Sequence, residues 1–262
     1  MQHIARKRFG QNFLHDPYFV QSCVRAIAPR PDDLMVEIGP GLGALTEPLL
    51  QTLKHLHVVE IDRDLIARLR QRHPPERVTI HEGDALKFDF GSLGSGLRVV
   101  GNLPYNISTP LLFHLAQYAA KVRDMHFMLQ KEVVERMVAA PSTPEYGRLS
   151  VMLQYRFFMD YLFDVPGGAF NPPPRVTSAF VRIAPLVPLP SPARDETIFA
   201  NMVASAFSTR RKTLRNALKS YLEAADMEAL GIDPMLRAEN LGMADFVRLA
   251  NHVAATRPDA QH

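Results

Sequence analysis

The chain has very little cysteine: Cys23 is the only one among 262 residues. A single thiol excludes an internal disulfide and suits a reducing compartment. The sequence also lacks a CxxC motif and any histidine and cysteine cluster at zinc-binding spacing, so we predict no structural metal. Its ten histidines are scattered, and we interpret them as surface or packing residues rather than ligands.

Long apolar runs are also missing. The basic segment Met1–Arg8 has no apolar stretch of the length found in signal peptides, and no window of the sequence is long enough to span a bilayer. We therefore expect a cytoplasmic protein that does not enter a membrane. The net charge is only +3, with a sequence pI of about 9.1, which permits a polyanionic partner without requiring one.

The remaining composition is that of an ordinary globular protein, 47% hydrophobic and 22% charged, and the length allows one α/β core plus a small second domain. From about residue 34, apolar runs typical of buried strands alternate with helical patterns. This alternation predicts a doubly wound, mainly parallel sheet. We predict strands at 34–38, 57–61, 78–80, 97–101, 125–129, 150–157 and 178–183.

The composition changes at Pro185–Pro192, where four of eight residues are proline and favour an extended spacer. After this segment the periodicity is helical only, with helices expected at 198–207, 210–221 and 246–253. We therefore predict an α/β domain at 1–186, of which 1–30 is an N-terminal segment that closes over the site, and an all-helical domain at 187–262. The sequence contains no internal repeat.

A glycine-rich turn, Glu37–Gly43, closes the first predicted strand and precedes a helix. Glycines let the backbone turn tightly and approach a ligand, and a helix N-terminus offers free N–H groups. Gly39, Gly41 and Gly43 have GxGxG spacing, whereas the dinucleotide fingerprint GxGxxG has its third glycine one position later to fit a pyrophosphate. We therefore expect a ligand without phosphates, which disfavours a nicotinamide-dependent dehydrogenase.

Two acidic residues, Glu60 and Asp84, follow the next two predicted strands. The carboxyl ends of parallel strands share one edge of the sheet, where open α/β sheets bind ligands. At this edge Glu60 could accept hydrogen bonds from ribose hydroxyls, and Asp84 could accept one from an adenine amino group. Either acid alone could equally be a helix cap or a solvated loop charge, but with the glycines they indicate a nucleoside site. An acidic edge also suits a cationic sulfonium donor better than an anionic dinucleotide.

The stretch Asn102–Tyr105 ends another predicted strand with a side-chain amide, backbone carbonyls and an aromatic ring. The exocyclic amino group of a base is a poor nucleophile, because its lone pair is delocalised into the ring. Oxygens of Asn102 and of Leu103 or Pro104 that accept both amino hydrogens would localise this pair, while Tyr105 stacks on the base. The stretch therefore indicates group transfer to an adenine-type nitrogen.

Taken in order, these motifs resemble the S-adenosylmethionine-dependent ribosomal RNA adenine dimethyltransferases, and most closely the bacterial small-subunit (KsgA-type) enzymes. The resemblance covers nearly the whole chain, and its motifs are Lys7–Leu14, Glu37–Gly43, Glu60, Asp84, Gly101–Ser108, Phe170–Val176 and Phe207–Asn216. It implies a Rossmann-like methyltransferase fold with a seven-stranded sheet and a small C-terminal helical domain. It also implies that S-adenosyl-L-methionine is the cofactor.

The same resemblance implies a substrate and roles for individual residues. The target would be two adjacent adenosines in the 3′-terminal hairpin of 16S rRNA, within a partly assembled small subunit, each receiving two methyl groups at N6. The implied cofactor-binding residues are Asn12, Leu14, Gly39, Gly41, Glu60, Ile61, Asp84, Ala85 and Asn102. The expected catalytic residues are Asn102, Leu103, Pro104, Tyr105 and Phe170, with Phe170 covering the face of a flipped-out base opposite Tyr105.

Two groups of basic residues are expected to contact RNA phosphates. The first is Arg6, Lys7 and Arg8, and the second is Arg210, Arg211, Lys212, Arg215 and Lys219. The second group puts five positive charges within ten residues of an expected helix with no acid among them. Because the repulsion between these charges is otherwise uncompensated, phosphate binding is favoured over a merely solvated face. We expect a monomer whose partner is rRNA.

Three relatives of this activity are alternatives. DNA adenine methyltransferases typically carry proline at the position of Leu103, and they need a larger target-recognition region. Enzymes that modify large-subunit rRNA usually carry isoleucine there and lack a segment like Phe170–Val176. A non-catalytic RNA-binding relative would tolerate the loss of donor contacts, whereas this sequence keeps all of them. We therefore predict an active small-subunit rRNA methyltransferase.

Overall fold

The structure is a computed structural model that describes residues 11–256, and it divides the chain into two compact units. The first unit contains the residues up to Val134 together with Phe158–Pro185. The second contains Glu135–Phe157 and the residues from Leu186 onward. One boundary thus lies at the proline-rich segment, but residues 135–157, expected in the first domain, group with the C-terminal helices.

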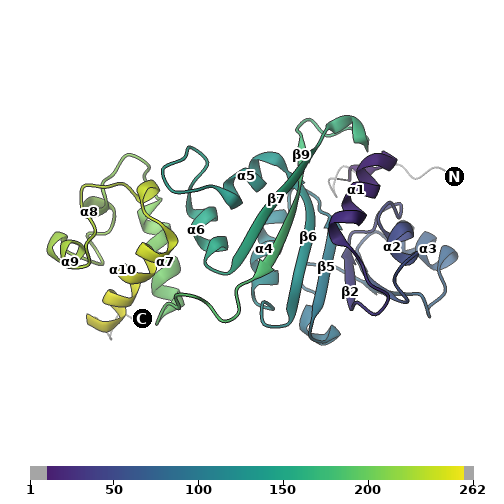
Figure 1. Cartoon of the computed structure of the whole chain (residues 1–262), viewed down its shortest axis with the longest axis horizontal. Helices are drawn as coiled ribbons and strands as arrows, with labels where there is room; N and C mark the ends of the chain where they lie inside the picture. The colour runs from purple at the N-terminus through teal and green to yellow at the C-terminus, as the bar shows by residue number, and fades with distance from the viewer. Residues whose placement is uncertain (1–10, 257–262) are drawn as a thin grey trace. The chain divides into compact units, whose positions relative to one another are not determined.

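A seven-stranded sheet forms the centre of the first unit (Figure 1), in the order β4-β3-β2-β5-β6-β9-β7. The strands are β2 (Met35–Ile38), β3 (Leu56–Glu60), β4 (Val78–Glu82), β5 (Leu97–Asn102), β6 (Val122–Gln130), β7 (Phe157–Val165) and β9 (Ser178–Pro185). The strands from β4 to β6 pair in parallel, and β9 pairs antiparallel with β6. The expected doubly wound, mainly parallel sheet is therefore confirmed.

Helices alternate with the strands of the first unit from β2 onward as the sequence predicts, whereas the helix before β2 was not predicted. They are α1 (Pro17–Ile27), α2 (Thr46–Leu50), α3 (Arg63–Arg72) and α4 (Ser108–Ala116), and α5 (Lys131–Val138) crosses the boundary between the units. Asp62 caps α3 by accepting the Asp64 N–H, and the apolar face of α3 is buried. Short 3₁₀ turns occur at Phe90–Leu93 and Gly167–Ala169. A separate two-stranded sheet pairs β1 (Phe13–Leu14) antiparallel with β8 (Phe170–Asn171).

The second unit is helical. Its elements are α6 (Arg148–Gln154), α7 (Glu196–Ala206), α8 (Leu214–Ala217), α9 (Ala224–Ala229), a 3₁₀ turn at Ala238–Asn240 and α10 (Met243–Thr256). The apolar stripe expected on the first C-terminal helix is buried on α7, and Phe246, Leu249 and Val253 of α10 belong to the same core. In the described part of the chain, no helix has the length and apolar character needed to cross a bilayer.

The strand expected at 150–157 is wrong, because residues 148–154 form α6 and β7 begins only at Phe157. Two polar side chains four residues apart explain the helix. Ser150 donates to Arg136 O, and Gln154 donates to Met137 O and Ala139 O at the end of α5. These bonds satisfy carbonyls that α5 leaves free, so a tertiary contact overrides the apolar run that suggested a strand.

The helix expected at 210–221 is also wrong in extent, since only Leu214–Ala217 is helical. The Leu214 N–H donates to Leu236 O at 2.7 Å, and the Arg215 N–H donates to Pro234 O at 3.1 Å. A neighbouring loop therefore takes backbone donors inside the predicted helix, which a helix begun at Arg210 would have used for its own hydrogen bonds. The turn before Leu214–Ala217 contains the basic residues Arg210, Arg211 and Lys212. These three charges therefore do not repel one another along a helix, contrary to the prediction from the sequence.

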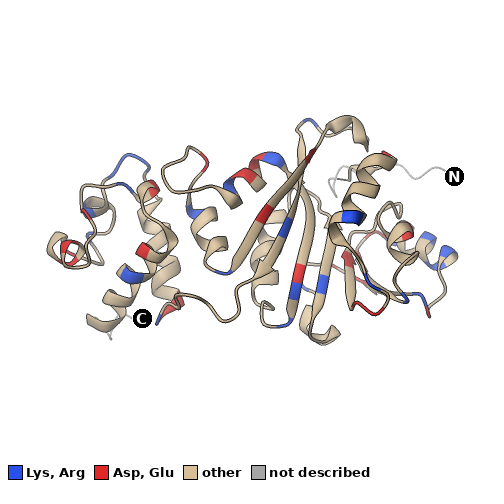
Figure 2. Cartoon of the chain, viewed as in Figure 1, with Lys and Arg blue, Asp and Glu red and all other residues tan. Residues whose placement is uncertain are grey.

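A buried ion cluster joins the amino ends of β5 and β6, where Figure 2 shows basic and acidic positions close together. Arg98 is 4% exposed and pairs with Asp33 at 2.7 Å and Asp124 at 2.8 Å. It also donates to the carbonyls of Ile27 and Ala28 at the end of α1. One guanidinium thus fixes a helix end, a loop and two strands of the first unit.

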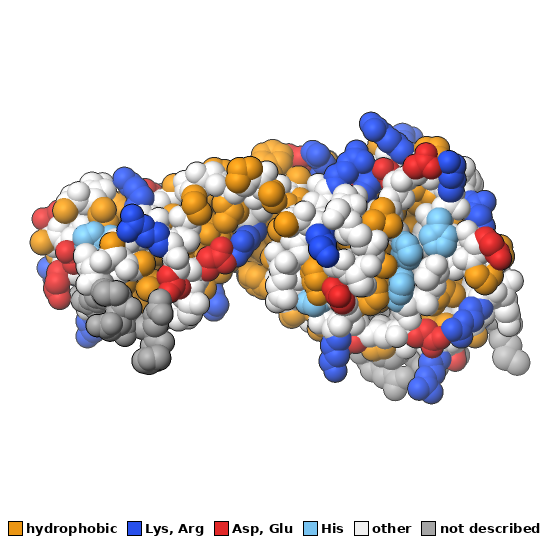
Figure 3. Space-filling view, turned by 90° about the horizontal axis from the view of Figure 1, so that it is seen from below, with side chains coloured by type: hydrophobic (Ala, Val, Ile, Leu, Met, Phe, Trp, Pro, Cys, Tyr) orange, Lys and Arg blue, Asp and Glu red, His pale blue; other side chains and the backbone are white. Residues whose placement is uncertain are grey.

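Figure 3 shows a group of histidine side chains at the surface, and three histidines form a row of rings along β3 and the neighbouring β4: His55 just before β3, His57 on β3 and His81 on β4. His57 Nδ1 lies 3.1 Å from His81 Nε2, and the His55 ring packs edge-on against His57. Burial, and then the neighbouring rings of His55 and His81, lower the pKa of His57 to about 4. His57, at the centre of the row, is therefore uncharged at neutral pH.

A further histidine, His126 on β6, makes the free energy of unfolding depend on pH in the acidic range. It is 1% exposed, and neither ring nitrogen has a hydrogen-bond partner among residues 11–256. Burial, and to a smaller extent Arg98 and Arg182, lower its pKa to about 4, although Asp124 opposes this shift. The unfolded chain therefore binds a proton that the folded chain does not between about pH 6.5 and 4, so stability falls as the pH drops through that window.

We expect His126→Leu to reduce this acid-side slope by up to about 1.4 kcal/mol per pH unit, the value for one proton. The measurement is the free energy of unfolding by urea at pH values between 4 and 7. His57 still titrates in the variant, so part of the slope should remain. His15→Gln, which removes an exposed histidine, is the comparison variant; equal slopes for wild type and His126→Leu would contradict the prediction.

Candidate functional site

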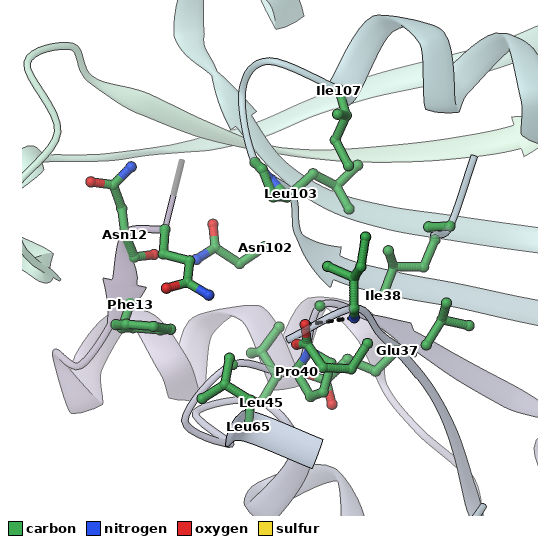
Figure 4. Close-up of a pocket in the computed structure, with 18 of the residues that line it drawn as sticks. Asn12, Phe13, Glu37, Ile38, Pro40, Leu45, Leu65, Asn102, Leu103 and Ile107 are labelled. Carbon is green, nitrogen blue, oxygen red and sulfur yellow. Dashed lines mark hydrogen bonds between the residues drawn. The ribbon is translucent and has the colours of Figure 1, made fainter. Parts of the chain in front are cut away.

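A pocket opens at the carboxyl ends of β2, β3, β4 and β5 in the first unit (Figure 4). The chain runs outward from β2 through β3 to β4 and then returns to β5 on the other side of β2. This reversal of strand order is the place where open α/β sheets bind ligands. The N-terminal segment, the glycine turn, Glu60, Asp84 and Asn102–Tyr105 all line the pocket, so one cavity brings the main sequence motifs together.

The glycine turn has the close approach expected of it. Gly39 and Gly41 have φ of 64° and 58°, in the left-handed region that favours glycine. A Cβ at Gly41 would lie 3.0 Å from the ring of Phe13, so a side chain there would press against the N-terminal segment. The Arg72 guanidinium donates to Leu42 O at 3.1 Å and supports the turn from α3.

The two acidic residues predicted from the sequence both keep acceptor capacity. Glu60 is 6% exposed, and its Oε1 accepts the N–H groups of Ile61 and Asp62, each at 2.8 Å. Burial raises the pKa of Glu60, although these hydrogen bonds oppose the shift. Asp84 Oδ1 accepts the Leu86 N–H at 2.9 Å, and its other oxygen has no partner among the residues that the structure describes. Ile61 and Ala85 also line the pocket.

A third acid, Glu37, lines the pocket and was missed by the sequence reasoning as a site residue. It is 2% exposed, and its Oε2 accepts the Thr46 hydroxyl at 2.6 Å. Burial raises its pKa to about 7; the hydrogen bond from Thr46 opposes this, and the charges of Glu60 and Glu47 add to it. The signal in the sequence was Glu37 itself, an acid inside the otherwise apolar run Leu34–Ile38. Burying a carboxylate in a core without a partner is unfavourable, so an acid at such a position indicates a site.

The pocket is acidic as a whole. Glu37, Glu60 and Asp84 line it, whereas no lysine, arginine or histidine does so among residues 11–256. A pyrophosphate would find no side-chain cation here, but a ligand with positive charge would be stabilised. The geometry therefore supports the expectation of a cationic nucleoside-type ligand over a dinucleotide.

Asn102 lies at the end of β5 with its amide fixed by the N-terminal segment. Its Nδ2 donates to the Asn12 carbonyl at 2.8 Å, and Figure 4 shows the two residues together on one side of the pocket. Because the nitrogen is used in this way, Oδ1 remains available as an acceptor. Asn12 and Leu14 thus lie at the pocket as expected, Asn12 acting through its backbone.

The backbone carbonyls that follow Asn102 differ in whether they are free to accept a hydrogen bond from a ligand. Pro104 O accepts the Ile107 N–H at 3.2 Å, and Tyr105 O accepts the Ser108 hydroxyl at 3.0 Å. The Leu103 carbonyl has no hydrogen-bond partner within the described part of the chain. Of the two carbonyls that the sequence leaves open, that of Leu103 is therefore the free one.

The two aromatic residues expected at the target base have different surroundings. Tyr105 lines the pocket, and its hydroxyl lies 2.6 Å from Ser178 Oγ. Phe170 is 3% exposed, belongs to the hydrophobic core and is not among the described residues that line the pocket. Its β8 pairs with β1, Phe170 opposite Leu14. A stacking role for Phe170 would need the ring to be uncovered, and it stays a prediction.

The expected RNA-binding residues are only partly described. Arg6, Lys7 and Arg8 lie outside the residues that the structure describes. Arg210, Arg211, Lys212, Arg215 and Lys219 are all exposed in the second unit. Arg210 also pairs with Glu239 at 3.4 Å, an exposed contact of the kind that stabilises little.

Glu60 offers a direct test of the pocket. We expect Glu60→Ala to weaken binding of S-adenosylmethionine or its analogue sinefungin by about 1.5–3 kcal/mol, the scale for hydrogen bonds to a charged group. Glu82→Ala is the matched control, since Glu82 lies opposite Glu60 on β4 but does not line the pocket. Calorimetric titration should show a weaker Kd for the first variant only; an unchanged Kd for Glu60→Ala would remove this residue from the site.

Comparison with known proteins supports the family resemblance. The model of the family described as ribosomal RNA adenine dimethylase matches residues 2–255. A protein from Aromatoleum aromaticum named ribosomal RNA small subunit methyltransferase A is 65% identical over 259 residues, covering 99% of this chain and 98% of its own length. A protein of the same name from Chromobacterium violaceum is 63% identical, covering 96% and 97%.

Solved structures give the same fold. A dimethyladenosine transferase from Plasmodium falciparum superposes with a TM-score of 0.79 at 27% identity, covering 90% of this chain and 95% of its own. The 23S rRNA methyltransferase ErmE superposes with a TM-score of 0.72 at 22% identity, covering 92% and 99%. The second likeness concerns the fold alone.

Proposed function

Because the chain belongs to the ribosomal RNA adenine dimethylase family and is therefore an S-adenosylmethionine-dependent methyltransferase, we propose that it dimethylates N6 of two adjacent adenosines in 16S rRNA. The target would be the 3′-terminal hairpin in a partly assembled small subunit, and the enzyme would act in ribosome biogenesis as a monomer. The observation that carries this proposal is the acidic pocket that ends at Asn102, with the free oxygens of Asn102 and Leu103 at its wall.

The residues of the pocket suit the donor. Bound S-adenosylmethionine supplies a methyl group made electrophilic by its sulfonium. Glu60 would accept from the ribose hydroxyls, beside Ile61, and the free oxygen of Asp84 would accept from the adenine amino group, beside Ala85. Gly39 and Gly41 would let the backbone approach the methionine part, and Glu37 adds a carboxylate that favours positive charge.

Asn102 and Leu103 would prepare the target nitrogen. N6 of an adenosine in a duplex is engaged in pairing, so the base must leave the stack to reach the pocket. Asn102 Oδ1 and Leu103 O would then accept the two amino hydrogens and localise the lone pair on N6. N6 would take the methyl group as the S–C bond breaks and the sulfonium becomes a neutral thioether. The methylated N6 would then carry a positive charge and release one acidic proton to solvent, so no strong general base is required.

Tyr105 would hold the base in plane by stacking on one face, and Phe170 is proposed for the other. Pro104 has a fixed φ and its carbonyl accepts the Ile107 N–H, so the Leu103 carbonyl is not used in that turn. The contribution of these residues is mainly geometric, since methyl transfer requires the nitrogen, carbon and sulfur to be in line.

Two observations favour the small subunit over the large subunit as the substrate. The relatives at 65% and 63% identity are named as small-subunit methyltransferases, whereas ErmE shares only 22% identity. The chain also has Leu103 and the segment Phe170–Val176, which the large-subunit enzymes usually lack. A non-catalytic relative would tolerate the loss of donor contacts, whereas this chain keeps Glu60 and Asp84 at the pocket.

RNA phosphates would contact the basic turn of the second unit. We expect the triple variant Arg210→Gln, Arg211→Gln, Arg215→Gln to reduce the slope of log affinity against log salt by about 2–3, since each phosphate contact contributes about 0.7–0.9. The control changes Arg25, Arg30 and Lys54 to glutamine; these are exposed residues of the first unit that do not line the pocket and carry the same total charge. An equal slope for both triple variants would exclude a specific contact.

The experiment that tests the proposed function uses isotopically labelled S-adenosylmethionine with ribosomal subunits from a strain that lacks this methylation. Mass spectrometry should place four methyl groups on two adjacent adenosines of 16S rRNA when small subunits are the substrate. Large subunits and free 16S rRNA are the comparisons. Label on 23S rRNA, or no label on any substrate, would overturn the proposal.

A further inference from the structure

Ser178 at the start of β9 does not line the pocket, but it contacts a residue that does. Its Oγ lies 2.6 Å from the hydroxyl oxygen of Tyr105, a residue 73 positions away that does line the pocket. Ser178 is 0% exposed, so this hydrogen bond is closed to water on the serine side. Because a buried hydroxyl without a partner is unfavourable, each hydroxyl stabilises the position of the other.

Tyr105 is held at its backbone as well. The Ser108 hydroxyl donates to Tyr105 O at 3.0 Å, and Ser108 is itself buried at the start of α4. Burial also raises the pKa of the Tyr105 phenol, so this group remains protonated across the neutral range. With the carbonyl and the phenol both held, the two ends of the residue are fixed, so the ring is kept beside the pocket in the free protein.

Ser178 itself is placed by the sheet. It pairs with Gln130 at the end of β6, and the neighbouring Lys131 N–H donates to Thr177 O at 2.9 Å. The residue therefore lies on a rigid strand rather than on a loop. Tyr105, by contrast, is in the connection between β5 and α4. The hydrogen bond thus fastens a loop residue of the site to a strand, which is how precise sites are supported.

We propose that Ser178 is a positioning residue for methyl transfer, which orients the Tyr105 ring on which the target adenine stacks. The inference rests on the proposed function, in which Tyr105 is the stacking surface. A base that meets a ring already in place loses less freedom on binding, and the in-line geometry is kept during transfer. Donor binding should not depend on this bond, because Ser178 is absent from the described residues that line the pocket.

The test removes the same hydrogen bond from its two ends, with Ser178→Ala and Tyr105→Phe, and then removes both in a double variant. Each single variant should lower kcat/KM for unmodified small subunits by about 3- to 10-fold, the scale of a neutral hydrogen bond. The double variant should lose no more than either single one, because they share one interaction. The Kd for sinefungin should stay within about twofold of the wild-type value in all three, since the donor contacts are intact.

The matched control is Ser150→Ala. Ser150 is also 0% exposed and its hydroxyl also forms a hydrogen bond, but it lies on α6 of the second unit. We expect this change to lower the thermal stability and to leave kcat/KM unchanged at temperatures where the protein is folded. Wild-type kcat/KM in both Ser178→Ala and Tyr105→Phe, or losses that multiply in the double variant, would overturn the proposal.

A second readout separates this inference from the proposed function, because it needs no RNA. In the free protein with ¹³C-labelled tyrosine, Ser178→Ala should shift and average the ring resonances of Tyr105, whereas Ser150→Ala should not. An unchanged Tyr105 ring signal would overturn the positioning role even if the enzyme methylates small subunits. If wild type fails to methylate them, the proposed function fails while this measurement still applies. If Ser178→Ala does not fold, Tyr105→Phe alone provides the kinetic test.

Discussion

Arg98→Met should destabilise the first unit by about 3–5 kcal/mol, the cost of breaking a buried ion pair by removing one partner. The variant leaves Asp33 and Asp124, both nearly buried, without the guanidinium that neutralises them. It also leaves the carbonyls of Ile27 and Ala28 without their donor at the end of α1. Urea unfolding followed by far-UV circular dichroism measures the loss.

The control for this prediction is Arg123→Gln. Arg123 pairs with the same Asp33 at 3.1 Å, but its side chain is 47% exposed, so we expect a loss below about 1 kcal/mol. Similar losses in the free energy of unfolding for the two variants would show that the buried ion pairs of Arg98 stabilise the fold no more than the exposed pair of Arg123.

The advantage of wild type over Arg98→Met should also depend on pH. Burial alone would raise the pKa of Asp33, but hydrogen bonds from Arg98 and from the Arg30 N–H, together with the charges of Arg98 and Arg123, bring it below its usual value. A carboxyl with a lowered pKa stabilises the fold above its unfolded pKa of about 4, and the contribution is lost as the pH falls through the lower, folded value. The difference between the two proteins should therefore shrink below about pH 4.

Asn102→Ala should lower the rate of methyl transfer by about 10²–10³, the effect of removing one preorganised electrostatic contact. The variant removes the Oδ1 acceptor from the wall of the pocket, while Glu60 and Asp84 remain. Donor affinity should therefore change much less than the rate. Single-turnover kinetics with saturating donor and unmodified small subunits separate the two quantities.

A matched control is Asn201→Ala, which removes the same side-chain amide from an exposed position on α7. We expect its rate to equal that of wild type. Turnover near the wild-type level in Asn102→Ala would contradict the role of this amide, and a parallel loss of donor affinity would indicate that the residue acts mainly in binding.

The parallel strands of the sheet and the acidic edge of the site could be predicted from the sequence because their signals are local, whereas the edge strand β7 was not predicted. Buried parallel strands appear as short apolar runs, and Glu60 and Asp84 each come at the end of such a run. The shared edge then follows from the parallel topology, without any knowledge of side-chain contacts. Asp62 could likewise be predicted as a helix cap from its own neighbours.

The parts that could not be predicted depend on contacts between distant segments. The helix at 148–154 is fixed by Ser150 and Gln154 reaching the end of α5, and its apolar residues alone resemble a strand. Arg210–Lys212 are in a turn because the backbone of the 234–236 loop binds the next residues. In the site, the bonds from Asn102 to Asn12 and from Tyr105 to Ser178 span 90 and 73 residues, and no local pattern indicates such pairings.

The most direct test of this mechanism is a crystal structure of the protein with S-adenosylmethionine bound. We predict that the ribose lies against Glu60, the adenine against Asp84, and the reactive methyl group beside Asn102 and Leu103 at the mouth of the pocket. A donor bound elsewhere on the chain, or bound with its methyl group turned away from these two residues, would contradict the central claim.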